Sequence, residues 1–470
     1  MRSGFLYSTA LLILMGINEI IKEAMSIVTP SIEEESKIFN IANMVVNTLR
    51  DGLARRGYYD FDVTIQGSVA KGTWLPGDRD IDIFIILPRG YVDKVRSGNV
   101  INDLIDVAID KGFRWNIRYA QHPYIQLLID SFEIDVVPCI RINPGEKPFT
   151  AADRTPLHTD FVKSRLGQRN TEVRLLKAFF KAIGVYGAEI RVQGFSGYVS
   201  ELLVIHYGSF TDTVKAMSRW SVKRVFIDMT GTYNERDAIR KFKSPVIIID
   251  PVDPNRNAAA SISRETLAMA IAAAKEFIKN PRIDFFLSNH ARPKPLRVLP
   301  TVILRIPYPN GTSPDVVWGE VKRLMATLIK NLRELDFRII RSMSWSDDKS
   351  IILLMLTLEQ LELPPYELHK GPYVDSEAVE NFVRKYVNDP SVIGPFIRGS
   401  RWYVIRSRKI LNAIDAIKHI IPMVSLKNLK NSISRVEYIT IKSLDDLTTL
   451  SPNERGVVEE FIYARPWWLT

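Results

Sequence analysis

The chain has 470 residues, of which 46% are hydrophobic and 10% aromatic. This length and composition exclude a disordered chain and predict roughly two to four folded domains. The 63 Lys and Arg residues exceed the 53 Asp and Glu residues, and the formal net charge of +10 favours a polyanionic partner without identifying one.

The amino-terminal residues and the cysteine content indicate a compartment. An apolar run over residues 5–15 is too short to span a bilayer and lacks a small-residue cleavage site, and a second methionine, Met25, precedes a polar stretch. Residues 1–24 are therefore interpreted as a dispensable extension. The single cysteine, Cys139, excludes an intrachain disulfide and a cysteine-based zinc site. We expect a cytoplasmic protein with no membrane partner.

Residues 25–155 predict a mixed α/β domain. Apolar residues recur at a spacing of three to four between Glu33 and Arg55, which is typical of an amphipathic helix. Short segments rich in apolar and β-branched residues then predict four strands, at Phe61–Gln66, Ile81–Leu87, Tyr124–Ile129 and Phe132–Pro138.

The rest of the chain predicts two further regions, which makes the fold class α+β and multi-domain. Helical periodicity dominates residues 156–290. Residues 291–470 are expected to form an α+β body and tail, because the order strand, helix, strand, strand is similar to part of a ferredoxin-like unit. The segments that give this order are Thr301–Ile306, Pro314–Leu335, Phe337–Ser344 and Ser350–Leu358.

Three aspartates are candidates for catalysis and metal binding. Asp80 and Asp82 lie two residues apart in a predicted strand, so both side chains leave the same face, and Asp78 extends the series. Two such carboxylates favour a hard divalent cation, and Mg²⁺ is the usual choice beside a triphosphate. Asp135 stands in an apolar strand, where an unpaired charge is costly. The three together would make a two-metal phosphoryl-transfer site.

The combination of motifs decides whether these aspartates form a catalytic site or belong to solvated turns. A lone Asp-x-Asp is more often a solvated turn. Here a Gly67-Ser68 turn, the Asp-Ile-Asp strand and the later Asp135 match the nucleotidyltransferase pattern GS…DxD…hDh. The glycine-serine turn suits the approach of backbone N–H groups and the Ser68 hydroxyl to a phosphate. We expect a mixed-sheet, polymerase-beta-like nucleotidyltransferase head.

More specific segments lie beyond the head. Residues 177–189, Phe195–Gly208 and Asp250–Asn257 resemble the archaeal class I CCA-adding enzymes, and the resemblance runs from about Met25 to the carboxyl end. It implies template-independent addition of C, C and A to the 3′ end of tRNA from CTP and ATP, with release of pyrophosphate and repair of incomplete ends. It also implies a homodimer with a helical neck between head and body.

The resemblance assigns roles to single residues, each with an ordinary alternative. Lys177 shares a helical face with Arg174 and Lys181, which without the family would be read as a solvated basic stripe. Arg256 would face the incoming base, and its alternative is a helix-flanking salt bridge. The implied metal ligands are Asp80, Asp82 and Asp135, and the implied nucleotide-binding residues are Ser68, Lys71, His158, Lys177, Tyr186 and Arg256.

Basic residues late in the chain are candidates for RNA binding. Folded RNA is gripped mostly through its phosphates and shape, which suits an enzyme that accepts every tRNA. The alternative is a solvated basic face packed by one Trp. The candidates are Arg398, Arg401, Trp402, Arg406 and Arg408.

Two rival functions stay open. A poly(A) polymerase or an oligoadenylate synthetase would share the three carboxylates but would make products of different length or linkage. A non-catalytic tRNA-binding protein would retain the fold, and the intact aspartates argue against it.

Overall fold

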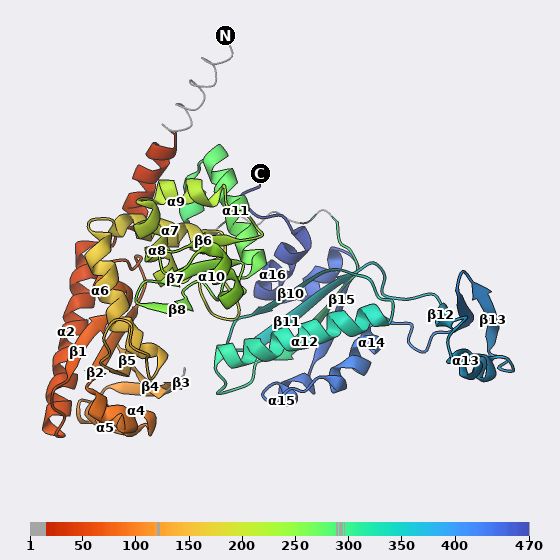
Figure 1. Ribbon diagram of the computed structural model, residues 1–470, viewed down its shortest axis with the longest axis horizontal. Coiled ribbons are helices and arrows are strands. Elements are labelled where there is room, and N and C mark those ends of the chain that lie inside the picture. The colour runs from red at the N-terminus through yellow and green to blue at the C-terminus, as the bar shows by residue number, and fades with distance from the viewer. Residues whose placement is uncertain (1–15, 120–122, 288–289, 291–294, 296, 470) are drawn as a thin grey trace, which may run out of the picture. The chain divides into compact units, whose positions relative to one another are not determined.

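The computed structural model describes residues 16–119, 123–287, 290, 295 and 297–469. The chain divides into two compact units, the first made of residues 1–290 with 468–470 and the second of residues 291–467 (Figure 1).

The first unit contains a five-stranded mixed sheet with the order β1-β2-β5-β4-β3. Strands β2 and β5 run parallel, and the other neighbouring pairs are antiparallel. The strands are β1 (Asp62–Gln66), β2 (Asp80–Leu87), β3 (Arg114–Tyr119), β4 (Pro123–Ile129) and β5 (Phe132–Ile140).

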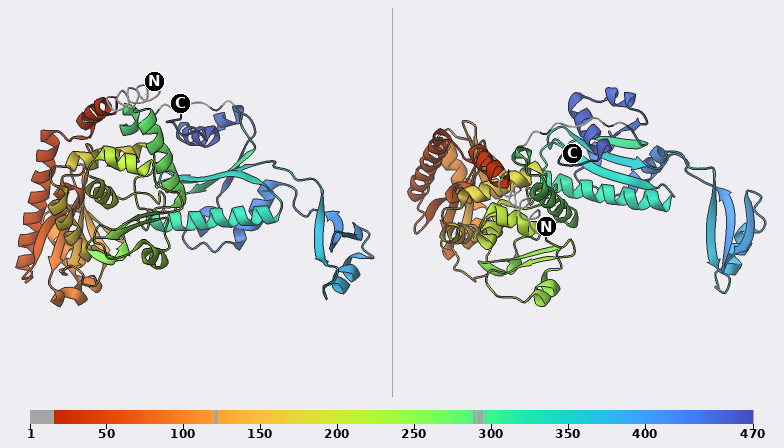
Figure 2. Two further views of the ribbon diagram at one scale, coloured as in Figure 1. Left: turned by 45° about the horizontal axis from the view of Figure 1, so that its top comes forward. Right: turned by 90° about the horizontal axis from the view of Figure 1, so that it is seen from above.

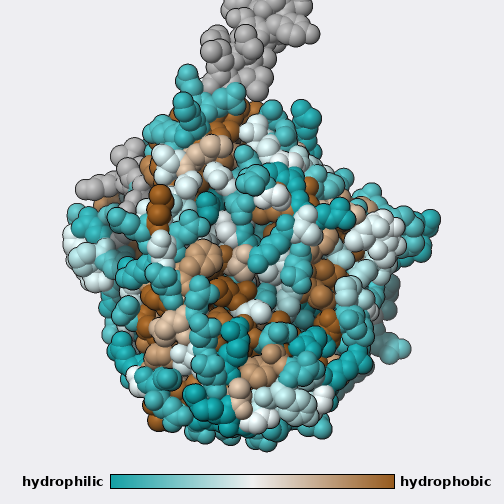
Figure 3. Space-filling model, turned by 90° about the vertical axis from the view of Figure 1, so that its left-hand side faces the viewer, coloured by the Kyte–Doolittle hydropathy of each residue, from teal (hydrophilic) through white to brown (hydrophobic). Residues whose placement is uncertain are grey.

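One face of this sheet is apolar and the other is polar, because successive side chains of a strand point to opposite faces. Ile81 and Ile83 of β2 and Ile134 of β5 belong to one core with the buried residues of helices α2 (Ile32–Arg55) and α5 (Asn99–Asp110). A capping box of Ser31 and Glu34 begins α2. The aspartates alternate with these core residues and lie on the polar face. Figure 3 shows the side of the molecule that lies to the left in Figure 1, where patches of apolar residues lie between hydrophilic residues.

Residues 16–28 are also helical and pack into the first unit. Ile17, Ile21, Ala24 and Val28 are all buried, and their spacing of four, three and four places them on one face of the helix. The sequence-based boundary at Met25 therefore divides a continuous helix, and residues 16–24 contribute to the core. Within the described residues, no helix has the length and apolar character needed to cross a membrane.

Helices form most of the remainder of the first unit. They are α6 (Thr155–Leu166), α7 (Asn170–Ala182), α8 (Gly197–Tyr207), α9 (Phe210–Met217) and α11 (Arg264–Lys279). A small sheet, absent from the sequence-based expectation of a helical region, is inserted among them. It consists of β6 (Val225–Ile227), β7 (Val246–Asp250) and β8 (Asp253–Asn257), accompanied by α10 (Glu235–Phe242). Every residue of β7 is buried, so its apolar run shows no alternation that would separate it from a buried helix.

The second unit has a four-stranded antiparallel sheet with the order β10-β11-β9-β15 (Figure 2). Its strands are β9 (Thr301–Pro307), β10 (Ile339–Ser346), β11 (Ile351–Leu358) and β15 (Glu437–Ile441). The predicted order of strand, helix and two strands is confirmed, with α12 (Pro314–Glu334) as the helix. Helices α12 and α14 (Ala413–Ile420) share one core with this sheet, and α16 (Pro452–Tyr463) shares a second.

The second unit also has a separate three-stranded antiparallel sheet, with the order β12-β14-β13. Its strands are β12 (Tyr366–Tyr373), β13 (Val392–Arg398) and β14 (Arg401–Ser407). Helix α13 (Val379–Tyr386) packs on one face, where the ring of Phe382 stacks on His369 with 6.1 Å between centroids.

Candidate active site

The three predicted carboxylates occupy neighbouring positions on the polar face of the five-stranded sheet. Asp82 of β2 is the register partner of Asp135 in β5, and Asp80 lies two residues earlier on the same face. The register partner of Asp80 is Glu133, an exposed fourth carboxylate that the sequence analysis missed. Its position two residues before Asp135 in an alternating strand was the available signal.

Gly67 allows the chain to approach Asp82 closely. It has a φ of +64°, and a Cβ added to it would stand 1.8 Å from Oδ2 of Asp82. Only glycine combines this backbone conformation with this lack of bulk. Gly67 also begins the short helix α3 (Gly67–Lys71), so the half-buried Ser68 is the next residue after the glycine that lies against Asp82. The glycine of the GS motif thus makes room for a carboxylate.

The pKa values of all three aspartates are raised. Burial raises the pKa of Asp135 to about 6, opposed by a hydrogen bond from Gln126 and reinforced by Asp82 and Asp80. Burial also raises the pKa of Asp82, where the charges of Lys71 and Lys177 act in the opposite direction. For Asp80, burial and then the neighbouring Glu133 raise the pKa. Ionised carboxylates in this arrangement favour a cation beside them.

The donor chemistry of this face suits a hard divalent cation, because all the ligand atoms offered are carboxylate oxygens on adjacent strands. In the described part of the chain, no three His, Cys, Asp or Glu side chains already form a group that could hold a metal ion. The fit therefore depends on the shared register and the oxygen chemistry of Asp80, Asp82 and Asp135.

Asp135 is held by a polar chain that extends to the edge of the sheet. Gln126 Nε2 donates to Oδ1 of Asp135 at 3.0 Å and to Oε2 of Glu133 at 3.1 Å. Oε1 of Gln126 accepts from Nε and Nη2 of Arg118 at 3.2 and 3.0 Å. Gln126 is also the cross-strand partner of Asp135, so β4 fixes the orientation of this carboxylate.

Two lysines predicted to bind phosphate meet at one buried carboxylate, Glu201 of α8. Lys71 Nζ lies 2.6 Å from Oε2 of Glu201, and their side chains are 8% and 1% exposed. Lys177 Nζ lies 3.9 Å from Oε1 and donates to the carbonyl oxygen of Thr73 at 2.8 Å. Burial lowers the pKa of Lys177 to about 8, and the charge of Glu201 opposes this change.

The interpretation of Lys177 as part of a solvated stripe is wrong, because the residue is only 2% exposed. Its helical neighbours have other partners. Arg174 Nε donates to the carbonyl oxygen of Trp74 at 3.1 Å, and Lys181 Nζ lies 2.9 Å from Oδ1 of Asp78. Oδ2 of Asp78 accepts the backbone N–H of Leu75 at 3.0 Å, so Asp78 stabilises the loop before β2.

The Tyr186 hydroxyl lies near Lys177, and both groups face Gly197, the first residue of α8. A Cβ added to Gly197 would stand 3.1 Å from the Tyr186 hydroxyl and 3.4 Å from Lys177 Nζ, so both groups crowd this glycine. Burial, followed by the charges of Asp78 and Glu201, raises the pKa of Tyr186. The tyrosine therefore keeps its proton and can donate it in a hydrogen bond.

His158 and Arg256 meet at a second buried carboxylate, Asp250 at the end of β7. Oδ2 of Asp250 lies 2.9 Å from His158 Nε2 and 2.7 Å from Arg256 Nη1, and Oδ1 accepts from the Tyr198 hydroxyl at 3.1 Å. Burial acts to raise the pKa of Asp250, but the bonds and charges of His158 and Arg256 lower it to about 2. Burial lowers the pKa of His158, so the neutral imidazole donates its Nε2 proton to Asp250.

Arg256 differs from its sequence-based description in one respect. It lies on strand β8, and its ion pair is not a helix-flanking one but is made with the fully buried Asp250. Its side chain is 38% exposed, so the guanidinium group also faces solvent. A planar group held by one carboxylate in this way retains donors for a ligand.

Known proteins match almost the whole chain. Family models match it as a nucleotidyltransferase domain over residues 46–158, as tRNA nucleotidyltransferase, second domain, over 171–287, and as CCA-adding enzyme, C-terminal domain, over 301–441. The CCA-adding enzyme of Pyrobaculum islandicum is 45% identical over 403 residues, which cover 86% of this chain and 93% of that protein. The chain belongs to the CCA-adding enzyme family.

Other relatives agree. The CCA-adding enzyme of Pyrobaculum aerophilum is 46% identical over 84% of this chain and 91% of that protein, and that of Saccharolobus shibatae is 35% identical over 95% and 99%. A solved Cid1 poly(U) polymerase with Mg and 3′-dATP aligns at a TM-score of 0.45 and 15% identity over 58% of this chain and 98% of that one, a likeness too distant to bear on function.

Family membership confirms the resemblance, the fold class and the enzyme class predicted from the sequence. The chain is a tRNA nucleotidyltransferase, and the relatives across most of its length do not favour the rival functions.

The basic residues proposed to bind RNA differ in their surroundings. Arg398 is exposed at the end of β13, whereas Arg401 lies over the ring of Tyr373, 3.3 Å from its centroid. Arg406 Nε lies 2.6 Å from Oε1 of Glu367. Arg408 is only 13% exposed and lies 2.7 Å from Asp336. Arg406 and Arg408 are thus neutralised within the second unit, which leaves Arg398 as the better candidate in this family member.

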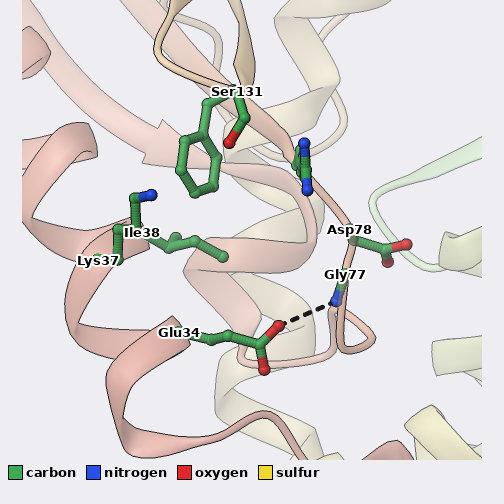
Figure 4. A pocket seen from close by; sticks show the side chains of 8 residues that line it. Glu34, Lys37, Ile38, Gly77, Asp78 and Ser131 are labelled. Carbon is green, nitrogen blue, oxygen red and sulfur yellow. Dashed lines mark hydrogen bonds between the residues drawn. The ribbon is translucent and has the colours of Figure 1, made fainter.

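A cavity of about 150 Å³ lies beside the loop that leads into β2 (Figure 4). Glu34 of α2 points into it and accepts the backbone N–H of Gly77 at 3.2 Å. This contact ties the first turn of α2 to the segment just before Asp80. The lining residues are Glu34, Lys37, Ile38, Gly77, Asp78, Arg79, Ser131 and Phe132.

Proposed function

We propose that this family member adds C, C and A to the 3′ end of tRNA from CTP and ATP at the polar face that carries Asp80, Asp82 and Asp135. The observation that carries the assignment is the register of Asp82 with Asp135, next to Gly67 and two buried lysines. The aspartates can bind metal ions and the two lysines can bind phosphate oxygens, which suits a metal–triphosphate complex.

Asp80, Asp82 and Asp135 would hold Mg²⁺. When bound, Mg²⁺ supplies activation of the tRNA 3′-hydroxyl and neutralises charge on the departing pyrophosphate. Lys71 and Lys177 would bind the triphosphate oxygens, with Ser68 and the Tyr186 hydroxyl as further donors. Gly67 leaves room for the Asp82 carboxylate against the start of α3, the helix that also carries Ser68 and Lys71.

The base would be read beside Asp250. This carboxylate fixes Arg256 and His158, and the free donors of the guanidinium group can bind the edge of cytosine or adenine. The same residues would serve both CTP and ATP, with the growing RNA end helping to choose between them.

We also propose a homodimer, which rests on the family resemblance, and a cytoplasmic location, which rests on the single cysteine. Light scattering of the purified protein tests the first. For tRNA binding, Arg398, Arg401, Trp402, Arg406 and Arg408 stay the proposed residues, with Arg398 first among them.

Incubation with tRNA lacking its CCA end and with labelled CTP and ATP tests the function. Incorporation should stop after three nucleotides, and long A tails or 2′-5′ linkages would contradict the proposal. Asp82→Ala should abolish incorporation and leave tRNA affinity nearly unchanged. Asp106→Ala is the matched control, because this exposed aspartate lies on α5, which packs on the apolar face of the same sheet. Full activity of Asp82→Ala would show that the site is wrongly placed.

A further inference from the structure

Glu201 has no role in the chemistry described so far, although it is completely buried beside the proposed triphosphate site. Both of its oxygens are engaged. Oε2 lies 2.6 Å from Lys71 Nζ, and Oε1 accepts from the Thr73 hydroxyl at 2.7 Å. The same hydroxyl accepts from Lys177 Nζ at 3.1 Å. One carboxylate thus organises both predicted phosphate-binding lysines.

The contacts join segments that are far apart in the sequence. Lys71 and Thr73 come from the end of α3 and the loop after it, Lys177 from α7 and Glu201 from α8. Burying three charges is costly unless they are paired and hydrogen-bonded, and removing one partner leaves an uncompensated charge. An apolar cluster could hold these segments together without that cost. Holding the segments together therefore does not explain why these three buried side chains are charged.

The location of the two lysines offers an explanation for the buried charges. The charges of Lys71 and Lys177 both act on the Asp82 carboxylate, so the two cations lie near the proposed metal ligands. An ammonium group has three N–H donors. Among the described residues, Lys71 donates to Glu201 and Lys177 donates to two oxygens of Thr73, so each retains a donor for an incoming ligand.

We propose that Glu201 is a positioning residue whose buried carboxylate holds Lys71 and Lys177 beside Asp82, ready to bind the triphosphate of CTP or ATP. This inference rests on the proposed function, because it assumes that the triphosphate binds at these lysines. Glu201 itself does not touch the nucleotide. It acts through the two ammonium groups, which it holds in place before the nucleotide arrives.

Inorganic tripolyphosphate is a direct probe, because it offers the phosphate chain without base or ribose. Its inhibition constant against CTP is measured with the full-length protein and Mg²⁺, together with the dissociation constant for tRNA. For Glu201→Gln we expect the inhibition constant to rise about tenfold, the equivalent of one pKa unit of lost charge interaction. The affinity for tRNA should stay unchanged. An unchanged inhibition constant would overturn the inference.

The pH dependence separates positioning from a purely structural role. Several charged groups act on Lys177: Glu201 and Asp78 raise its pKa, and Lys71 and Lys181 lower it, with Asp82 and Tyr186 also nearby. Removing the Glu201 charge should therefore lower this pKa, and the loss of tripolyphosphate affinity with rising pH should begin at a lower pH than in the wild type. A structural role would leave this midpoint in place.

Two further variants serve as a control and as an alternative to Glu201→Gln. Glu320→Gln is the matched control, because Glu320 is also buried but accepts backbone N–H groups of residues 427–429 in the second unit. It should lower the melting temperature and leave tripolyphosphate inhibition unchanged. If Glu201→Gln does not fold, Thr73→Val removes the hydroxyl between Glu201 and Lys177 and should produce a smaller rise in the same inhibition constant. No rise in Thr73→Val would then overturn the inference.

Lys177→Met shows whether a negative result counts against the role of Glu201 or against the proposed triphosphate site. If Lys177→Met left tripolyphosphate inhibition unchanged, the proposed triphosphate site would be wrong. If Lys177→Met raised the inhibition constant and Glu201→Gln did not, the site would stand and only the role of Glu201 would be overturned.

Discussion

Gly67→Ala offers a sharp test of the active-site geometry. The added Cβ would stand 1.8 Å from Oδ2 of Asp82, and real Cβ contacts are essentially never shorter than 3.0 Å, so the atoms must separate by about 1.2 Å. The left-handed backbone at this position adds a strain of about 1–2 kcal/mol for a residue with a side chain. A displacement of about 1 Å in a reacting group costs on the order of 100-fold in rate. We therefore expect kcat for CMP incorporation to fall about 100-fold.

The strain and the clash can be separated with a second glycine. Gly112 has a φ of +69° and no neighbouring atom within 4 Å of an added Cβ, so Gly112→Ala introduces similar strain without a collision. Both variants should lose stability in thermal unfolding, Gly67→Ala at least as much as Gly112→Ala because it adds the collision to the strain, and only Gly67→Ala should lose activity. Equal kcat values for the two variants, measured with tRNA lacking its CCA end, would refute the placement of Asp82 against α3.

Three further predictions concern other parts of the molecule. Because the pKa of Asp135 is raised to about 6, its carboxylate is protonated at lower pH, and Mg²⁺ affinity measured by metal titration should fall below that pH by up to about tenfold per pH unit. An affinity that is constant from pH 7 to pH 5 would contradict the assignment of Asp135 as a ligand. Arg398→Glu should weaken tRNA binding and reduce its salt dependence, because this cation is exposed, whereas Arg406→Glu should mainly lower the melting temperature through loss of its pair with Glu367. The opposite pattern would favour Arg406 as the RNA contact. Ile21→Asp should lower the melting temperature, since it loses the roughly 1.5–3 kcal/mol gained by burying an isoleucine, and Lys22→Asp on the exposed side of the same helix should not. Equal melting temperatures would show that residues 16–28 add nothing to the fold.

The sequence predicted those features that depend on local spacing. Asp80 and Asp82 are two residues apart, and a strand places them on one face whatever surrounds it. The same rule applies to the alternation of β5 around Asp135. The order of β9, α12, β10 and β11 followed from periodicity, because each element has a long segment with a clear apolar pattern.

Features that depend on distant partners could not be read in this way. Lys177 shares its helical face with two cations, and only the folded chain shows that it is buried among residues from α3 and α8. Gln126 and Asp250 carry no local signature of their role, since one becomes important through its cross-strand neighbour and the other through His158 and Arg256. Strand β7 was missed because a strand buried on both faces has no polar alternation.

The parallel pairing of β2 with β5 has a consequence for variation in chain length. Asp82 and Asp135 meet only through this register, and the intervening residues 88–131 contain α4 (Val92–Arg96), α5 and the antiparallel strands β3 and β4. An insertion at the exposed turn around Gly112 would leave the register intact and should be tolerated. A single residue inserted within β5 before Asp135 would turn its carboxylate toward the apolar core. The turn around Gly112 can therefore vary in length without moving Asp135, whereas the start of β5 cannot.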